Sequence, residues 1–200
     1  AIIAARYFSG NYEKSREFLF WHGYIPKMIS KSRFSRRLNA IDLDVLNEIF
    51  SVIAQGFIKA NIDGDYAIDS FPIAVCANVR MERCKIFESK DYYGFCASKQ
   101  QFYYGVKVHM LVTKSGQPVE FIIEPGASSD IKIARSFKFN IPPKSKIHAD
   151  KGYTDYAFED YLELQRQIQL LVKRKSNSKR KEKAVSGKIR KVVETAFSVI

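Results

Sequence analysis

Two aspartates each end a short apolar run that has the composition of a buried strand. Asp69 ends the run 66–68, and Asp150 ends the run 146–149. Catalytic groups of open α/β sheets gather at the carboxyl ends of parallel strands, so two such strands side by side would bring both carboxylates together. Two close negative charges need a cation between them, or one of them must take up a proton. Mg²⁺ suits this position because it prefers oxygen ligands and keeps open positions for phosphate and water. Each aspartate alone has a simpler interpretation, as a turn or cap residue.

A third acid, Glu194, lies on a helix predicted over residues 188–200, one turn after Arg190. The two could form an ion pair within the helix. Arg before Glu is the less favourable order for such a pair, which would contribute only a few tenths of a kcal/mol. The alternative is a glutamate that faces the sheet, with Arg190 orienting it or gripping a phosphate.

The elements around these acids are expected to form a mixed α/β sheet flanked by helices. Alternating apolar residues predict a long strand over 102–113 and a returning strand over 118–124, joined as a hairpin. Short strands are expected at 66–69, 146–149 and 168–172, and helices at 130–139, 153–165 and 188–200. No assignment is made for residues 74–101.

The first sixty residues are predicted to be helical, with one helix over 26–38 and another capped by Asp42. The turn-rich stretch 61–65 marks a boundary, so we expect a helical part at 1–62 and an α/β part at 63–200. Three short helices with a basic middle one resemble a helix-turn-helix DNA reader, in which Arg33, Arg36 and Arg37 would contact DNA. A plain helical cap with a solvated basic face is the alternative.

The charge balance favours a polyanionic partner. The 200 residues carry 33 Lys and Arg against 21 Asp and Glu, a formal net charge of +12. Nucleic acid ranks ahead of a membrane surface as that partner, and no apolar run approaches the roughly 20 residues that a membrane span needs. The segment 173–183 is either a DNA contact or a solvated loop, and its residues assigned to DNA are Lys173, Arg174, Lys175, Lys179, Arg180 and Lys181.

Four segments, read together, resemble the landmarks of DDE transposases, and more narrowly of the 982 family of bacterial insertion sequences. They are Ile68-Asp69-Ser70-Phe71-Pro72, Tyr103 to His109, Ala149-Asp150-Lys151-Gly152-Tyr153 and Arg190 to Phe197. The resemblance implies an RNase H-like catalytic domain, preceded by the small helical region. It also implies a metal-dependent polynucleotidyl transferase that cuts and rejoins DNA.

The resemblance further implies roles for individual residues. Asp69, Asp150 and Glu194 would be the catalytic acids and would bind two Mg²⁺, for which Mn²⁺ can substitute. Arg190 matches the arginine of a helix signature in related enzymes, but Gly187 stands where a tyrosine is usual. Lys151 would contact backbone phosphate, with a surface lysine in a turn as the alternative. The partner would be double-stranded DNA, both the inverted-repeat ends of the element and the target, and we hypothesise a homodimer that joins two ends.

Two further functions stay open at this point. One is a non-catalytic DNA-binding remnant, and the other is a different nuclease of the RNase H-like fold. The sequence begins with Ala1 and ends six residues after Glu194, so we expect a C-terminally truncated catalytic domain with weak activity. The expected location is the bacterial cytoplasm, in association with the nucleoid.

Overall fold

The computed structural model describes residues 2–76, 78–96, 99–176, 178–181 and 185–198, and the chain separates into two units, Ala1–Phe50 and Ser51–Ile200. The division falls within helix α4 (Leu43–Ala60). The boundary expected at residues 62–63 lies in the turn between α4 and the first strand. The assignment of DNA binding to the first part and of catalysis to the second therefore stays a prediction.

The first unit is helical, and side-chain caps set where its helices begin. Its other helices are α1 (Ile2–Phe8), α2 (Tyr12–Trp21) and α3 (Lys31–Asn39). The Asn11 side chain accepts a hydrogen bond from the Lys14 amide, and Ser30 accepts one from the Arg33 amide. The helix predicted over 26–38 was therefore wrong at its start, because the Ser30 cap begins it at Lys31. The connection over residues 22–30 is longer than the three- or four-residue turn of a helix-turn-helix.

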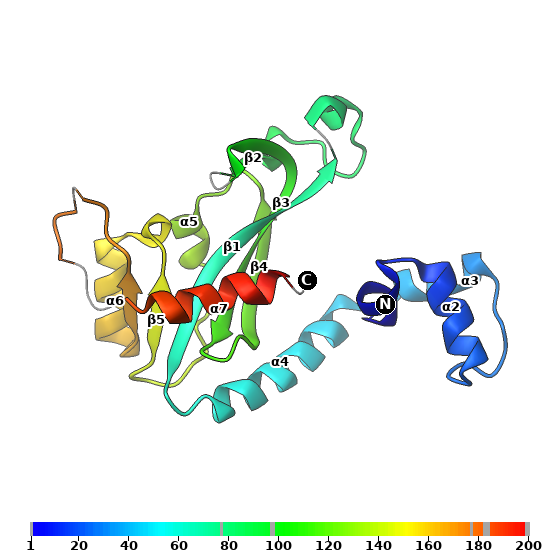
Figure 1. The fold of residues 1–200 in the computed structure, drawn as a ribbon, viewed down its shortest axis with the longest axis horizontal. Helices are drawn as coiled ribbons and strands as arrows, with labels where there is room; N and C mark the ends of the chain where they lie inside the picture. The colour runs from blue at the N-terminus through cyan, green and yellow to red at the C-terminus, as the bar shows by residue number, and fades with distance from the viewer. Residues whose placement is uncertain (1, 77, 97–98, 177, 182–184, 199–200) are drawn as a thin grey trace. The chain divides into compact units, whose positions relative to one another are not determined.

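The second unit is built on one mixed sheet of six strands (Figure 1). The strands are β1 (Asp65–Cys76), β2 (Tyr93–Cys96), β3 (Gln101–Thr113), β4 (Pro118–Pro125), β5 (Lys146–Ala149) and β6 (Gln169–Val172). The order is β2-β3-β1-β5-β6, with β4 also paired to β3. Pairs β1–β3, β2–β3 and β3–β4 are antiparallel, whereas β1–β5 and β5–β6 are parallel. The predicted mixed α/β sheet flanked by helices, preceded by a helical region, is confirmed.

Strand β1 is longer than predicted and does not end at Asp69. It continues to Cys76 because residues 66–76 pair with β3 along its length. Its parallel neighbour β5 pairs only as far as Ile68, so beyond that residue β1 has one open edge, where Pro72 can sit without breaking a central ladder. Gly105 allows the close approach at the irregular end of this pairing, since a Cβ there would lie 2.0 Å from the Ile73 carbonyl oxygen.

Helices connect and cover the strands. They are α5 (Asp130–Ala134), α6 (Tyr156–Arg166) and α7 (Gly187–Ser198), with the short 3-10 helices η1 (Asn78–Arg83), η2 (Lys90–Tyr92) and η4 (Lys151–Tyr153). Two predicted bounds were wrong. Helix α6 starts at Tyr156 because the Asp155 side chain caps it. Helix α5 ends at Ala134, and the amides of residues 138 and 139, which a longer helix would use internally, donate to Glu120 instead. No helix in the described part of the chain is long and apolar enough to span a membrane.

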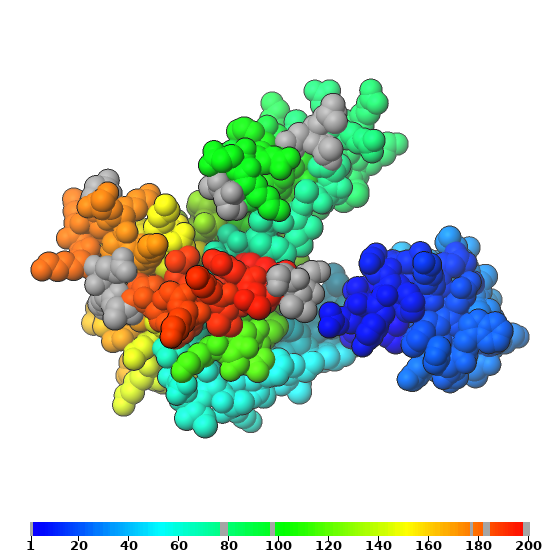
Figure 2. All heavy atoms as spheres, in the orientation of Figure 1, coloured from blue at the N-terminus to red at the C-terminus, as the bar shows by residue number. Residues whose placement is uncertain are grey.

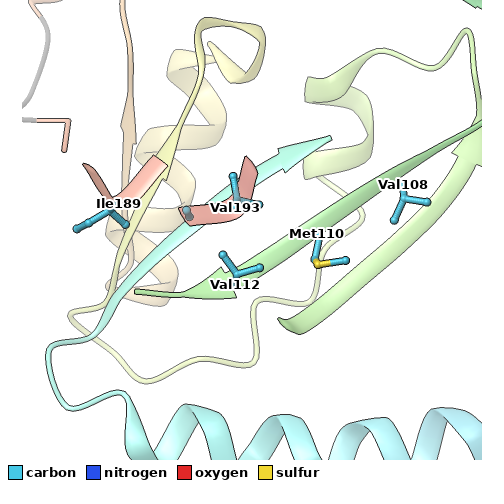
Figure 3. Close-up of a cluster of buried hydrophobic side chains, with 6 residues drawn as sticks. Val108, Met110, Val112, Ile189 and Val193 are labelled. Carbon is cyan, nitrogen blue, oxygen red and sulfur yellow. The ribbon is translucent and has the colours of Figure 1, made fainter. Parts of the chain in front are cut away.

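Helix α7 packs across one face of the sheet. Ile189 and Val193 of the helix meet Val108, Met110 and Val112 of β3, all of them buried (Figure 3). Near the end of the helix, the rings of residues 71 and 197 lie 4.3 Å apart. Residues at 69, 108 and 110 therefore share the sheet face that α7 covers, because side chains alternate between the two faces along each strand. This packing positions the last predicted acid above the sheet.

Candidate active site

The parallel pairing of β1 with β5 brings two of the three predicted acids together. Ile68 pairs with Ala149, and each of these residues is directly followed by one of the aspartates, Asp69 or Asp150. Neighbouring strands lie roughly 4.8 Å apart, so the two carboxylates lie close together at the carboxyl end of β5. Both lie on the face covered by α7, as do Ala67 and His148, which come two residues earlier on the two strands.

Asp69 is in an environment that disfavours its negative charge. Burial raises the pKa of Asp69 to about 6 from 3.8, and the nearby negative charges of Asp150 and Asp130 raise it further. Two interactions lower the pKa of Asp69. The Ser70 amide donates a hydrogen bond to Asp69 Oδ1 at 2.8 Å, and the positive charge of Arg190 lies nearby. The folded state therefore disfavours the ionised form of Asp69, mainly through burial.

Arg190 partly neutralises the negative charge of Asp150. Its Nη2 atom lies 3.3 Å from Oδ1 of Asp150, and the two side chains are 18% and 36% exposed. From the sequence, Arg190 could either form a helical ion pair with Glu194 or act near the sheet. The structure gives it a partner from the sheet, at the end of β5, and not the glutamate one turn later on its own helix.

Glu194 is carried by α7 but is turned to solvent. Its neighbour Val193 is 1% exposed and packs into the core, whereas Glu194 is exposed and, among the described residues, its side chain makes no hydrogen bond or ion pair. It shares a helix face with Arg190, four residues earlier. The outer side of α7 forms part of the surface of the unit (Figure 2). Within the described residues, no group of three or more acidic, histidine or cysteine side chains is arranged to hold a metal ion.

The donor atoms nevertheless suit a hard divalent cation. Asp69 and Asp150 offer carboxylate oxygens, the ligands that Mg²⁺ prefers. Burial is the main cause of the raised pKa of Asp69, because it disfavours the ionised carboxylate. A cation bound there would lower the energy of the ionised Asp69. The two aspartates at this edge therefore fit a metal, and Glu194 would have to turn from solvent to join them.

The basic residues assigned to DNA differ in how available they are. Those of the helical unit surround one buried residue, Phe34, and are exposed themselves: Arg33, Arg36 and Arg37. In the second unit, Lys151, Lys173, Lys175, Lys179 and Lys181 are also exposed. These side chains are free to approach a polyanion from solvent.

The two arginines of the basic segment are held against α6 instead. Arg174 forms a two-pronged ion pair with Glu159, with side chains only 6% and 7% exposed. Arg180 makes a similar pair with Asp160 at 2.7 and 2.8 Å, and is 43% exposed. Both guanidinium groups lie over the Tyr156 ring, 5.2 and 4.7 Å from its centroid. Arg174 therefore has an internal structural role, and its contact with DNA stays a prediction. Residues 177 and 182–184 lie outside the described residues.

A polar group that lies next to the acids received no role from the sequence. It consists of Ser70, Lys107, His109, Asp130 and Tyr153. Lys107 and His109 are two residues apart on β3, so the alternation of the strand could have shown that they share a face. Their contact with Asp130 joins distant segments, and no spacing in the sequence predicts it.

Comparison with known proteins places the chain in a family. The Transposase DDE domain family matches residues 59–200. A search of curated proteins found no match. A solved structure of the piggyBac transposase synaptic complex with hairpin DNA is similar, with 16% sequence identity and a TM-score of 0.41. That similarity covers 76% of this chain and 32% of that one, so the chain spans about a third of the length of that transposase. Because the family match covers well over half of the residues, the chain belongs to the family of transposases with a DDE domain.

Proposed function

We propose that the chain carries out metal-dependent DNA strand cleavage and strand transfer, as the transposase of an insertion sequence of the 982 family. The observation that supports this most is the parallel pairing of β1 and β5, which places Asp69 beside Asp150. The family match gives a transposase role in general terms. The metal dependence, the residue roles and the DNA substrates are the proposal.

Three acids would hold two Mg²⁺ ions, or Mn²⁺ in their place: Asp69, Asp150 and Glu194. When bound, such ions lower the pKa of a water molecule and stabilise the leaving oxygen. Burial disfavours the charge of Asp69, so its ionised form would be stabilised by a neighbouring cation. Glu194 would join from α7, on the helix face whose Arg190 already contacts Asp150.

Arg190 and Lys151 would position the DNA backbone. Arg190 forms an ion pair with Asp150, and a planar guanidinium also binds phosphate oxygens well. Lys151 is exposed in the turn directly after Asp150, so its ammonium group would contact the same strand. The exposed lysines of the segment 173–181, with Arg180 at its edge, and the arginines of α3 would add contacts that do not depend on sequence.

Two successive reactions at phosphorus would follow. Water would attack the phosphodiester bond at each end of the element, leaving a 3′-hydroxyl on the element and a 5′-phosphate on the flanking strand. That 3′-hydroxyl would then attack a phosphodiester bond of the target DNA, so one bond forms as another breaks. The protein needs no covalent intermediate. Two ends must react together, which is the reason to propose a homodimer.

The test is nicking of duplex DNA that carries the inverted repeats flanking the gene, with Mg²⁺ or Mn²⁺. Asp69→Asn, Asp150→Asn and Glu194→Gln are each expected to abolish nicking while the chain still binds DNA. Asp63→Asn is a matched control, since that exposed carboxylate precedes the same strand at its other end and pairs with Lys114. Normal nicking by Asp69→Asn would defeat the metal assignment. DNA binding without nicking by the unaltered chain would favour the non-catalytic DNA-binding remnant.

A further inference from the structure

A buried polar network lies on the face of the sheet opposite to α7. Ser70 of β1 and His109 of β3 are directly paired, and their side chains point away from the face that carries Asp69 and Met110. Asp130, the first residue of α5, lies over them. Its Oδ1 atom accepts hydrogen bonds from Ser70 Oγ at 3.3 Å and from Lys107 Nζ at 3.2 Å.

The network is connected to Asp69 through one residue. The hydroxyl of Ser70 is held by Asp130, while the backbone amide of Ser70 donates to Oδ1 of Asp69 at 2.8 Å. A shift of Ser70 along or across the strand would therefore move the donor that orients the Asp69 carboxylate. Asp130 thus acts on Asp69 from the other face of the sheet, without touching it.

The same network is connected to Asp150 through the turn that follows it. A Cβ atom on Gly152 would lie 2.7 Å from Oδ2 of Asp130, so a larger residue in this turn would have to displace the carboxylate. The next residue, Tyr153, donates its amide hydrogen to the Asp150 carbonyl oxygen at 3.0 Å. Its hydroxyl lies 3.2 Å from His109 Nδ1, and both side chains are at most 1% exposed. The turn after Asp150 is therefore fixed to β3 and to Asp130.

The network contains one ion pair at pH 7, between Lys107 and Asp130. Burial lowers the pKa of His109 to about 4, so its ring is neutral at pH 7, and its Nε2 lies 4.0 Å from Asp130, beyond a hydrogen bond. Lys107 is the cation that faces Asp130, with side chains 17% and 29% exposed. Lys107 also donates to the Ser128 carbonyl oxygen at 3.0 Å, next to the start of α5. Asp130 is thereby held in place with its two oxygens directed at Ser70 and Gly152.

We propose that Asp130 is a positioning residue, which fixes Asp69 through Ser70 and Asp150 through the Gly152–Tyr153 turn so that both carboxylates can share a cation. This inference rests on the proposed function, because it assumes that the two acids bind metal. Partners that orient ligating side chains typically change metal affinity or activity by about 10–100-fold when they are removed. Loss of the Asp130 carboxylate should therefore weaken metal binding without altering any metal ligand.

The first test measures Mn²⁺ affinity of the whole chain by electron paramagnetic resonance, with Mn²⁺ alone, well below the unfolding temperature. Asp130→Asn keeps the size of the side chain and is expected to raise the Kd for Mn²⁺ at least about ten-fold. Glu120→Gln is the matched control. It alters a carboxylate of the same unit that accepts two backbone amides, far along the chain from the acids. If Asp130 had only a structural role, Asp130→Asn would lower the unfolding temperature, as Glu120→Gln is expected to do, and would leave the Kd for Mn²⁺ unchanged.

The second test uses the close contact with Gly152. Gly152→Ala should displace the Asp130 carboxylate and weaken Mn²⁺ binding, and it should cause no further loss when combined with Asp130→Ala, which opens the space. Additive losses would show that residue 152 acts independently of Asp130 and would overturn the proposed connection. This variant also covers the case in which Asp130→Asn fails to fold.

The outcomes separate this inference from the function on which it rests. If the unaltered chain binds no Mn²⁺ in a manner that Asp69→Asn removes, the proposed function fails and the positioning role fails with it. If the unaltered chain binds Mn²⁺ through Asp69 and Asp130→Asn binds it equally well, only the positioning role is refuted. A ten-fold loss in Asp130→Asn, with an unchanged Kd in Glu120→Gln, supports it.

Discussion

Replacing Asp69 by asparagine should make the protein more stable at neutral pH while it removes a proposed metal ligand. Burial raises the pKa of this carboxyl to about 6 from 3.8, since the folded state disfavours its charge. Asparagine keeps an oxygen to accept the hydrogen bond from the Ser70 amide but carries no charge. The variant is therefore free of the electrostatic cost that the aspartate bears.

The size of the effect follows from linkage between protonation and folding. A folded-state pKa above the unfolded one stabilises the fold at low pH, and this stability is lost as the pH rises from about 4 through about 6. One pKa unit corresponds to about 1.4 kcal/mol, so the displacement from 3.8 to about 6 amounts to about 3 kcal/mol at pH 8. For a unit of this size, that difference raises the unfolding temperature by roughly 5–10 °C.

The assay is thermal unfolding followed by circular dichroism at pH 8 and near pH 4, without divalent metal. Asp69→Asn should unfold at a higher temperature than the unaltered chain at pH 8, and the two should converge near pH 4. Asp63→Asn, which removes an exposed carboxylate paired with Lys114, should give no such gain. Equal unfolding temperatures at pH 8, or a gain that is the same at both pH values, would refute the reasoning. Added Mg²⁺ should stabilise the unaltered chain and not the variant.

Three other predictions test the packing and the DNA surface. Arg174→Met leaves Glu159 buried without its partner and should lower the free energy of unfolding by about 3–5 kcal/mol in urea denaturation; a loss under about 1 kcal/mol would mean that the pair is solvated. Met110→Ala opens a cavity beneath α7 and should cost about 2–5 kcal/mol in the same assay, whereas no change would argue against this packing. Removing exposed lysines of the basic segment should lower the slope of log K against log salt by about 0.9 for each phosphate that the protein then leaves unneutralised, measured by fluorescence anisotropy on duplex DNA. The lysines to replace are Lys173, Lys175, Lys179 and Lys181, and Lys114→Ala is the control. An unchanged slope would exclude the basic segment from the DNA interface.

Much of the sheet could be predicted because its signals are local. The hairpin of β3 and β4 and the bounds of β5 follow from alternating residues and turn residues. The extension of β1 beyond Asp69 could not be predicted, since it depends on antiparallel pairing with β3 and contains Pro72, a residue that normally ends a strand. Likewise, α5 ends at Ala134, and Glu120 of β4 binds the amides of residues 138 and 139, within the span predicted as helix. In both places, a contact between distant residues overrides the local pattern.

The candidate site was predicted in part for the same reason. The sequence suggested two parallel strands with an aspartate at the end of each, and the structure brings these aspartates together directly after the last parallel pair, although Asp69 lies within β1. The spacing of Arg190 and Glu194 could not show that the arginine would reach Asp150 while the glutamate faces solvent. Asp130 appeared only as a helix start. Its contacts with Ser70, Lys107 and Gly152 arise from four separate segments, which become neighbours only when the sheet forms.

The most direct test of the central claim is the position of Mn²⁺ in crystals of the chain, located by anomalous scattering. We expect a Mn²⁺ ion in contact with the carboxylates of both Asp69 and Asp150, with Arg190 displaced from Asp150 and Glu194 turned toward the ion. Mn²⁺ bound only at other carboxylates, with Arg190 still paired to Asp150, would contradict the account.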